Sequence, residues 1–238
     1  FNRMNNPSIR ILGVNLGIKN CNINRVVQEP NTGGTIHRVP PLHSRGDKMK
    51  IGVPMEPEGE TRVAIVPGSM KKLQKAGFEV VVEKGAGIAA NYSDSEYTEA
   101  GASIGDRKDV MSCEIVISIR IPDTGELSKG QIIACVADPF RHPEKVQACI
   151  DGGITLMSMD MIPRRLSRAQ SMDVNSSQDN LAGYKAVLLG ASQVPRGIPM
   201  MTTSAGTVRP AKVVIMGSGV AGLQAIATAK RLGAVVYA

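Results

Sequence analysis

The stretch "AKVVIMGSGVAGLQAIATAKRLGAVVYA", residues 211–238, decides the fold. An apolar strand, Val213–Met216, runs into a glycine-rich turn, and a helix over Val220–Leu232 leads to a second strand, Ala234–Ala238. In such a unit the first glycine permits a tight turn, the second lets a pyrophosphate approach the backbone, and the third lets helix and strand pack closely. Free N–H groups at the helix start bind the phosphates. The pattern predicts a dinucleotide-binding turn, whose candidate cofactor-binding residues are Gly217, Ser218, Gly219, Val220 and Gly222.

A second interpretation of this turn stays open, namely a glycine-rich turn in a sheet that binds no ligand. The choice between NAD and NADP is also open, because the acidic residue that binds a ribose 2′-OH is expected about twenty residues past the glycines, just beyond Ala238. About four further strands of a Rossmann domain are expected after the same point. We therefore interpret residues 211–238 as the start of an NAD-binding Rossmann domain, truncated at its C-terminus, and expect this chain alone to bind dinucleotide poorly.

Strands and helices also alternate upstream of this stretch. The strands are β-branched and apolar on both faces, which is typical of a parallel sheet covered by helices on both sides. The sequence predicts an α/β fold of two Rossmann-like parallel-sheet domains: an N-terminal α/β domain over 49–180, a linking helix and connector over 181–210, and the incomplete second domain from 211. The expected strands of the first domain are 49–54, 78–87, 114–122, 131–137 and 154–160, and its expected helices are 67–77, 94–102 and 142–153.

Basic charge is concentrated at the N-terminus. Residues 1–50 hold eight Lys and Arg against two acids, whereas the remaining residues are nearly balanced. We interpret residues 1–48 as a disordered or targeting-like extension. The high isoelectric point therefore belongs to this extension. With aromatic residues at 3% and no basic face on a domain, the composition argues against nucleic-acid binding.

Cysteine, histidine and hydropathy patterns exclude several classes of protein. The four cysteines, Cys21, Cys113, Cys135 and Cys149, are widely spaced without a CxxC pair, which predicts reduced and mostly buried thiols. The three histidines show no ligand spacing, so no metal site is expected. No apolar run approaches the roughly 18 residues of a membrane span. We expect a chain that is soluble by itself.

A dense polar loop, "RRLSRAQSMDVNSSQDN" over 164–180, follows the last strand of the first domain. Open α/β sheets place ligands at the C-terminal ends of their strands. The guanidinium, amide, hydroxyl and carboxylate groups here suit the carboxamide and ribose of a nicotinamide nucleotide, and they suit positioning better than attack. The polar residues that the loop offers are Arg165, Arg168, Gln170, Asp173, Ser176, Ser177 and Gln178, and among them Arg165 and Asp173 can pair, each fixing the other. The alternative is a solvated, self-paired loop that caps the helix beginning at 180.

A third polar stretch, "MEPEGETRVAIVPGSM" over 55–70, contains Arg62 after a run of acids. Two interpretations are open for this arginine. It reaches a cleft between the domains, or it is an ion-paired surface residue.

Three segments together resemble a known family: "KIGVPMEPEGETRVAIVPGSMKKLQKAGFEVVVEKGAG", "RAQSMDVNSSQDNLAGYKAV" and "GTVRPAKVVIMGSGVAGLQAIATAKRLGAVV". The chain resembles the NAD(H)-binding component, the alpha subunit or domain I, of proton-translocating NAD(P) transhydrogenase, and more distantly alanine dehydrogenase. The resemblance covers about residues 49–238, and the RAQS…D…SS…NxAGY segment is its most discriminating motif.

The resemblance implies a homodimer of two-domain subunits. It also implies that NADH passes hydride directly to NADP⁺ held on a partner component, coupled to proton movement through a membrane component. Arg165, Asp173 and Ser176 would then set the nicotinamide end of NAD(H), Gln170 would face the NADP nucleotide, and Gly217, Gly219 and Gly222 would hold the pyrophosphate. The implied location is the matrix face of the mitochondrial inner membrane or the cytoplasmic face of the bacterial membrane.

Two departures and two rival functions accompany this resemblance. Arg164 adds one arginine next to Arg165, and Asn175 stands where the family pattern is usually apolar. An alanine dehydrogenase is one rival, but Arg120 stands where a Lys would be wanted and "CVADPFRHP" offers no His at the matching site. A non-catalytic dinucleotide-binding module or fragment is the other.

Overall fold

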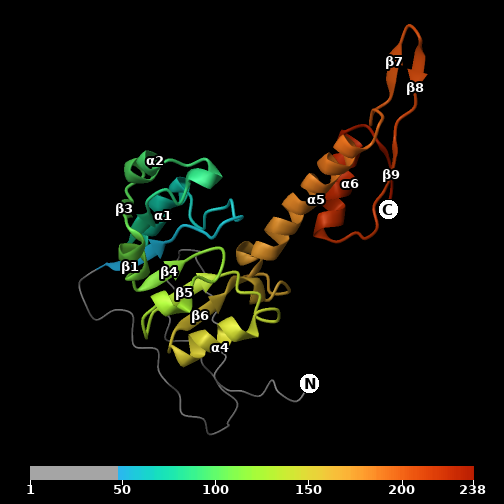
Figure 1. The fold of residues 1–238 in the computed structure, drawn as a ribbon. Helices are drawn as coiled ribbons and strands as arrows, with labels where there is room; N and C mark the ends of the chain where they lie inside the picture. The colour runs from blue at the N-terminus through green and yellow to red at the C-terminus, as the bar shows by residue number, and fades with distance from the viewer. Residues whose placement is uncertain (1–47) are drawn as a thin grey trace, which may run out of the picture. The chain divides into compact units, whose positions relative to one another are not determined.

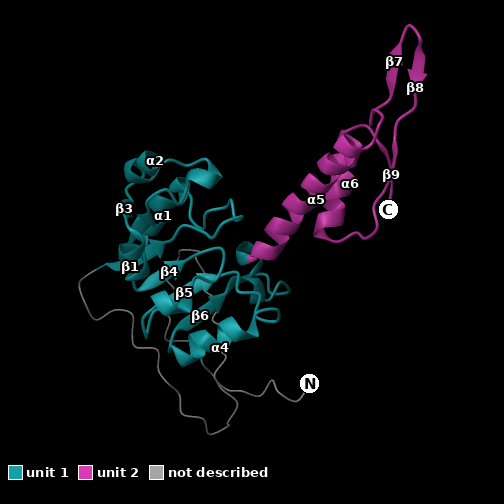
Figure 2. Cartoon of the chain, viewed as in Figure 1, with its two compact units in different colours: residues 1–172 teal, residues 173–238 magenta. Residues whose placement is uncertain are grey.

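The structure, a computed structural model, describes residues 48–238. Two compact units divide the chain, with the boundary between Met172 and Asp173 (Figure 2). Unit 1 is described from Lys48 to Met172, and unit 2 is Asp173–Ala238. The predicted N-terminal extension up to residue 47, together with Cys21, His37 and His43, lies outside the described residues.

Unit 1 is built on a six-stranded, all-parallel sheet with the order β3-β2-β1-β4-β5-β6 (Figure 1). This confirms the predicted α/β fold class. Every strand expected in this unit is present, with ends trimmed by one to five residues. One more, β3, was not predicted. The strands are β1 Met49–Val53, β2 Phe78–Glu83, β3 Ser103–Gly105, β4 Ile115–Ile117, β5 Ile132–Cys135 and β6 Thr155–Ser158.

The strand order reverses between β1 and β4. Successive connections step outward from β1 to β2 to β3, and the chain then returns to β4 and steps the other way to β5 and β6. Right-handed crossovers place the connections of the two halves on opposite faces of the sheet. The covering helices are α1 Met70–Lys75, α2 Asp94–Glu99, α3 Arg107–Met111 and α4 Pro143–Asp151.

Local sequence explains where the short helices begin. Ser93 and Glu96 form a reciprocal capping box at the start of α2, and Asp106 and Asp109 form another at the start of α3. Each box satisfies two backbone N–H groups that a helix end leaves without partners. Helix α3 was not predicted, since its five residues are too few to show a helical period.

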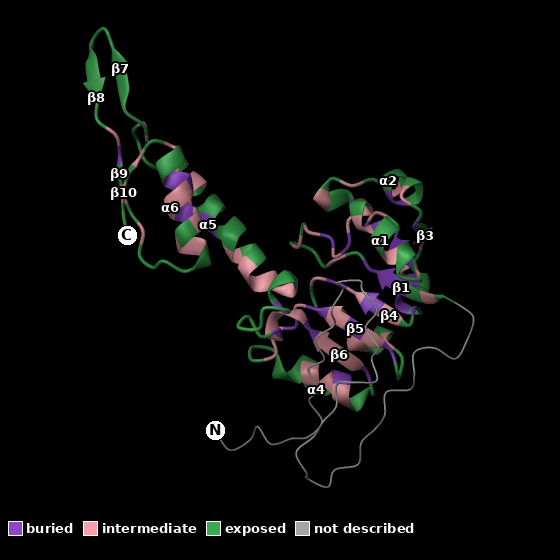
Figure 3. Ribbon diagram, turned by 180° about the vertical axis from the view of Figure 1, so that it is seen from behind, coloured by how far each residue is buried: buried purple, intermediate pink, exposed green. Residues whose placement is uncertain are grey.

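The core of unit 1 lies along the sheet, where Figure 3 shows buried segments on β1 and β4. Val53, Val82, Val116 and Ile133 are fully buried. In β1 a Cβ built on Gly52 would lie 2.1 Å from the carbonyl oxygen of Val110. Helix α3 therefore crosses β1 backbone to backbone, an approach that only glycine permits.

Unit 2 begins with a 20-residue helix, α5 Val174–Gln193. The predicted helix began at 180, six residues too late. The polar residues before it are its first turns, because Asp173 caps the helix through the Ser176 N–H. The unit continues with β9 Lys212–Val214, α6 Val220–Arg231 and β10 Val235–Tyr237, and β10 pairs parallel with β9. This strand–turn–helix–strand order confirms the sequence prediction.

An antiparallel hairpin occupies the segment expected as a connector. Strands β7 Met201–Thr203 and β8 Gly206–Val208 pair across a tight turn in which Gly206 has a φ of +131° (Figure 1). The Thr-rich composition favours strand here, but so short a hairpin with every residue exposed gave no buried alternation to recognise.

Three cysteines of the described chain, Cys113, Cys135 and Cys149, are free and buried, as predicted. Burial raises the pKa of the Cys135 and Cys149 thiols, which keeps them protonated. Across residues 48–238 no helix combines the length and apolar character that crossing a membrane requires.

Tyr97→Phe tests the one fully buried tyrosine of unit 1. The Tyr97 hydroxyl donates to the Ile65 carbonyl oxygen at 2.8 Å inside the core. We expect Tyr97→Phe to lower the free energy of unfolding by about 1 kcal/mol, because the carbonyl loses its partner in a buried setting. Urea denaturation measures the change, with Tyr92→Phe, whose ring is only partly buried, as the control. An unchanged midpoint for Tyr97→Phe would show that the bond contributes nothing.

Candidate functional site

The turn between β9 and α6 has the geometry that its glycines predict. Gly217 has a φ of +103°, which L side chains rarely adopt. A Cβ on Gly222 would lie 1.9 Å from the Gly217 carbonyl oxygen, so the first turn of α6 rests directly on the strand exit. Around Gly219, by contrast, no atom lies within 4 Å of a built Cβ, and the backbone is open to approach.

Helix α6 starts without a side-chain cap. Gly219 is its N-cap residue, and the Gly219 carbonyl accepts from the Leu223 N–H at 2.8 Å. Helices α2, α3 and α5 each carry a side-chain cap at this place, whereas α1 and α4, like α6, do not. The first N–H groups of α6 thus keep their donors for another acceptor, and the helix dipole favours an anion there. Residues 217–220 are exposed, so the donors, the open backbone and the access all fit a bound pyrophosphate.

The candidate loop residues Arg165 and Gln170 belong to unit 1. The loop after β6 folds as successive short turns, with N–H···O=C bonds from Leu166 to Pro163, Ala169 to Leu166 and Met172 to Ala169. Buried Ile162 and Ala169 attach this series of turns to the unit. Arg165 and Gln170 are exposed, and Gln170 begins a 3-10 turn, Gln170–Met172. The loop therefore presents its polar side chains from a hydrogen-bonded frame.

Asp160 holds the base of this loop against β5. Its carboxylate accepts from the Ser158 hydroxyl at 2.6 Å and from the backbone N–H groups of Ala137 and Asp138 at 3.1 and 3.0 Å. Asp138 has a φ of +45°, a left-handed conformation that costs about 1 kcal/mol or more for a residue other than glycine. The bonds to Asp160 stabilise that conformation at the C-terminal end of the strand.

Asp173 and Ser176 lie together in unit 2 at the start of α5. The Asp173 carboxylate accepts from the Ser176 N–H at 2.9 Å and from the Ser176 hydroxyl at 2.6 Å. Both residues are partly buried, and they belong to the same compact unit as Gly217, Ser218, Gly219, Val220 and Gly222. Two of the loop candidates are thus brought into direct contact, and the helix cap explains why Asp and Ser stand three residues apart.

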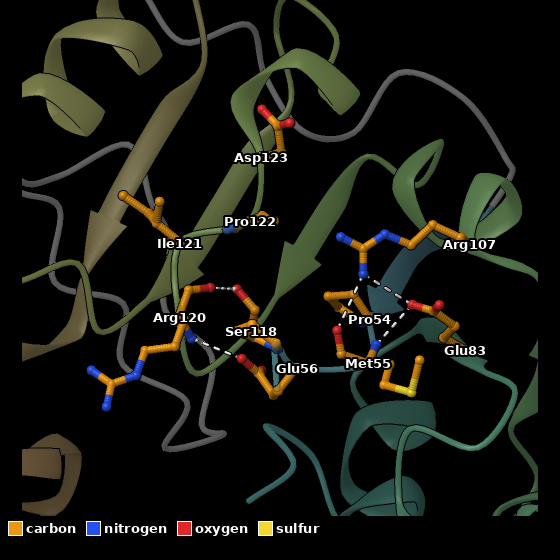
Figure 4. Close-up of a pocket in the computed structure, with 11 residues that line it drawn as sticks. Pro54, Met55, Glu56, Glu83, Arg107, Ser118, Arg120, Ile121, Pro122 and Asp123 are labelled. Atoms are coloured by element: carbon orange, nitrogen blue, oxygen red, sulfur yellow. Dashed lines mark hydrogen bonds and ion pairs between the residues drawn. The ribbon is translucent and has the colours of Figure 1, made fainter. Parts of the chain in front are cut away.

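A pocket of about 380 Å³ in unit 1 was missed by the sequence reasoning. It lies at the C-terminal ends of β1 and β4, where the strand order reverses and where open sheets place ligands (Figure 4). In Figure 4 the Glu56 carboxylate points to the chain after β4, where it accepts from the backbone N–H groups of Ile119 and Arg120. Arg107 joins Glu83 to the carbonyl of Met55 on the other side. The acids in "MEPEGE" and the polar "SIRIPD" were the available signal.

Glu56 binds the backbone N–H groups that this pocket would otherwise offer to a ligand. A carboxylate on two adjacent backbone N–H groups occupies the place that a ligand anion takes in such a crevice. Burial raises the pKa of the Glu56 carboxyl, while the two backbone bonds act in the opposite direction. The same two bonds explain why β4 ends at Ile117, short of the predicted 122, because these N–H groups bind a side chain and not a neighbouring strand.

Arg62 is ion-paired, as one of its two interpretations proposed. Its guanidinium donates to both oxygens of Glu60, from Nε at 2.7 Å and from Nη2 at 2.6 Å. Arg120 reaches the same carboxylate at 3.2 Å. The hydrogen bonds from Arg62 lower the pKa of Glu60 to about 2. Because the Glu60 side chain is 9% exposed, this is a half-buried cluster with a firmly ionised centre.

Comparison with known families gives two adjoining matches. Residues 52–182 match the family described as alanine dehydrogenase/PNT, N-terminal domain, and residues 186–238 match alanine dehydrogenase/PNT, C-terminal domain. Together these matches account for nearly all of the described chain.

Three individual proteins illustrate the similarity. The first segment of the NAD(P) transhydrogenase subunit alpha of Rhodospirillum rubrum is 47% identical over 201 residues, which cover 80% of this chain and 52% of that protein. A crystal structure of transhydrogenase from Sinorhizobium meliloti is 46% identical with a TM-score of 0.76, covering 79% of this chain and 57% of that one. Alanine dehydrogenase of Bacillus subtilis is 32% identical, covering 78% and 50%. The chain spans about half the length of the curated relatives it matches.

Glu60→Gln tests the charged cluster through the dependence of stability on pH. A pKa lowered in the folded state contributes stability that is present above the ordinary value of 4.5 and is lost as the pH falls towards 2. Because both arginine partners are partly exposed, we expect Glu60→Gln to cost about 1–2 kcal/mol at pH 7. Denaturation at a series of pH values should show this difference shrinking between pH 4.5 and about 2.

The matched control is Glu58→Gln, in the same loop but exposed, which should change the free energy of unfolding by less than about 0.5 kcal/mol at pH 7. A Glu60→Gln difference that stays constant from pH 7 to the acid limit would contradict the account of the cluster.

Proposed function

Because the chain belongs to the alanine dehydrogenase/PNT family, we propose that it is the NAD(H)-binding component of a proton-translocating NAD(P) transhydrogenase. In this proposal the component passes hydride directly between NADH and NADP⁺ held on a partner component. The observation that carries the proposal is the uncapped, glycine-built start of α6 in a chain 47% identical to a transhydrogenase alpha subunit.

The proposed task of the chain is positioning. Backbone N–H groups of residues 218–220 hold the pyrophosphate, with the Gly217–Gly222 contact keeping them in place. Asp173, the N-cap residue of α5, and Ser176, in its first turn, together with Arg165 set the nicotinamide end, and Gln170 faces the NADP nucleotide. When bound, NADH supplies the hydride and its two electrons, so no side chain has to give or take a proton. Transfer then requires the two nicotinamide rings to be held in line at roughly 3–3.5 Å.

Two observations in unit 1 weigh against alanine dehydrogenase activity. Reduction of a keto acid needs a cationic or acidic group directed at the carbonyl, commonly a Lys and a His. Arg120 stands in place of the Lys, and Glu60 and Glu56 already bind its side chain and its backbone N–H. His142 lies at the start of α4, where its ring pairs with Glu144 at 3.3 Å. The lower identity to alanine dehydrogenase, 32%, agrees with this choice.

The proposal includes partners and a location. Hydride acceptance requires an NADP-binding component, and energy coupling requires a membrane component that conducts protons. We propose a homodimer associated with these components at the matrix face of the mitochondrial inner membrane or the cytoplasmic face of a bacterial inner membrane. The Rhodospirillum rubrum relative is named as one segment of a subunit alpha, which supports the existence of further subunits.

A transfer assay tests the proposed function. The full-length protein, mixed with an NADP-binding component from a transhydrogenase, should oxidise NADH and reduce an NADP analogue with equal stoichiometry. Without that component no reduction should occur, since the acceptor has no site. Alanine-dependent reduction of NAD⁺ in place of analogue reduction would favour alanine dehydrogenase. Tight NADH binding with neither reaction would favour a non-catalytic binding module.

Arg165→Ala and Asp173→Ala should separate positioning from binding. We expect each to slow hydride transfer at least tenfold while NADH affinity falls only a few-fold, because a misplaced ring loses the reactive geometry more than the binding contacts. Single-turnover transfer and equilibrium NADH titration measure the two quantities. Transfer at the parental rate in both variants would refute the role of the loop.

Two controls sharpen this test. Arg164→Ala removes the neighbouring arginine, and a loss there with a normal Arg165→Ala would shift the assignment by one residue. Asp173→Asn keeps a good helix cap while removing the charge. It should therefore match Asp173→Ala in transfer rate if the carboxylate acts on the cofactor, and should match the parent if only the cap matters.

A further inference from the structure

Helices α5 and α6 touch backbone to backbone at one glycine. Gly183 is the buried residue of α5. A Cβ built on Gly183 would lie 2.0 Å from the carbonyl oxygen of Ala221, and 2.8 and 3.0 Å from its carbonyl carbon and Cα. All three atoms belong to the backbone, so no change of rotamer would make room.

The contact falls inside the phosphate turn itself. Ala221 is the second residue of α6 and lies between Val220 and Gly222. Gly222 in turn rests on the Gly217 carbonyl, 1.9 Å from a built Cβ. Three backbone segments are therefore stacked without intervening side chains: the middle of α5, the first turn of α6 and the exit of β9. A shift of α5 would move the turn directly.

The N-terminal end of α5 carries two of the residues that are predicted to contact the nicotinamide. Asp173 caps α5, and Ser176 lies in its first turn. From Ser176 to Gly183 a helix rises about 10 Å along its axis. A hydrogen bond also joins the two helices less than one turn from the glycine contact. The side-chain amide of Asn180 donates to the side-chain oxygen of Gln224 at 3.3 Å. Helix α5 thus links the place predicted for the nicotinamide to the place predicted for the pyrophosphate through rigid backbone.

We propose that Gly183 is a positioning residue for the dinucleotide, whose backbone contact with Ala221 sets the phosphate turn at a fixed offset from the start of α5. The inference rests on the proposed function, since it assumes that one dinucleotide spans both places. The affinity of a ligand that reaches only the phosphate turn does not depend on this offset. The affinity of a ligand that spans the turn and the start of α5 does.

Gly183→Ala is the test, with Gly190→Ala as its matched control. Both glycines lie in α5, but a Cβ on Gly190 meets no atom within 4 Å. The probes are NADH, which spans both places, and ADP-ribose, which lacks the nicotinamide. We expect Gly183→Ala to lower the affinity for NADH about tenfold, because the added methyl group overpacks against the backbone of α6 and forces the two helices apart. In the same variant the affinity for ADP-ribose should change less than about twofold. Gly190→Ala should leave both affinities at the parental value.

Each outcome decides the matter. A Gly183→Ala variant with the parental preference for NADH over ADP-ribose would overturn the inference while leaving the proposed function standing. Equal losses for both probes would also overturn it, since the turn itself would then be damaged. A parental protein that binds neither probe would overturn the proposed function, and this inference with it.

A second variant covers the case in which Gly183→Ala does not fold. Asn180→Ala combined with Gln224→Ala removes the side-chain tie without adding an atom. Because an exposed hydrogen bond contributes little, the preference for NADH over ADP-ribose should fall about twofold. An unchanged preference in a folded double variant would overturn the inference.

Discussion

The close approach of Gly222 to the carbonyl oxygen of Gly217 is the contact on which the candidate site depends. It lets α6 begin directly behind the exit of β9, at a helix start that no side chain caps. A side chain at position 222 would force α6 away from β9, and the turn would lose its conformation. The positive φ of Gly217 also allows α6 to begin directly after β9, because the chain has to reverse its direction within a few residues.

The two units deal in opposite ways with the same physical problem, which is backbone N–H groups at the end of a strand or the start of a helix. In unit 1, at the crevice where the strand order reverses, the carboxylate of Glu56 binds the backbone N–H groups of Ile119 and Arg120. In unit 2 the donors at the start of α6 have no such side chain. A nucleotide-type fold therefore need not mean a nucleotide site in each unit. The uncapped helix start of unit 2 supports the proposed dinucleotide site, whereas the pocket of unit 1 is stabilised by its own charges.

Alternation of apolar strands and helices was enough to predict the parallel sheet and the strand–turn–helix at the end of the chain. It did not predict β3 and α3, which are too short to carry a period, or the exposed hairpin β7–β8. The sequence does not predict the early start of α5, because the polar residues of "DVNSS" favour a loop, although Asp173 is a good helix cap. The pocket of unit 1, for which the sequence offers only the polar residues of "MEPEGE" and "SIRIPD" as a signal, and the Gly183 contact were missed for a different reason. Each joins segments that are far apart in sequence, and only the strand order and the crossing of α5 with α6 bring them together.

Hydrogen exchange of the full-length protein with and without NADH tests the central claim most directly. If the start of α6 holds the pyrophosphate, backbone amides of residues 217–223 should gain protection on binding, and those of residues 118–121, beside the pocket that Glu56 lines, should not change. Protection at 54–57 and 118–123 with none at 217–223 would contradict the account, because the ligand would then occupy the crevice of unit 1 and the glycine turn would be only a structural corner.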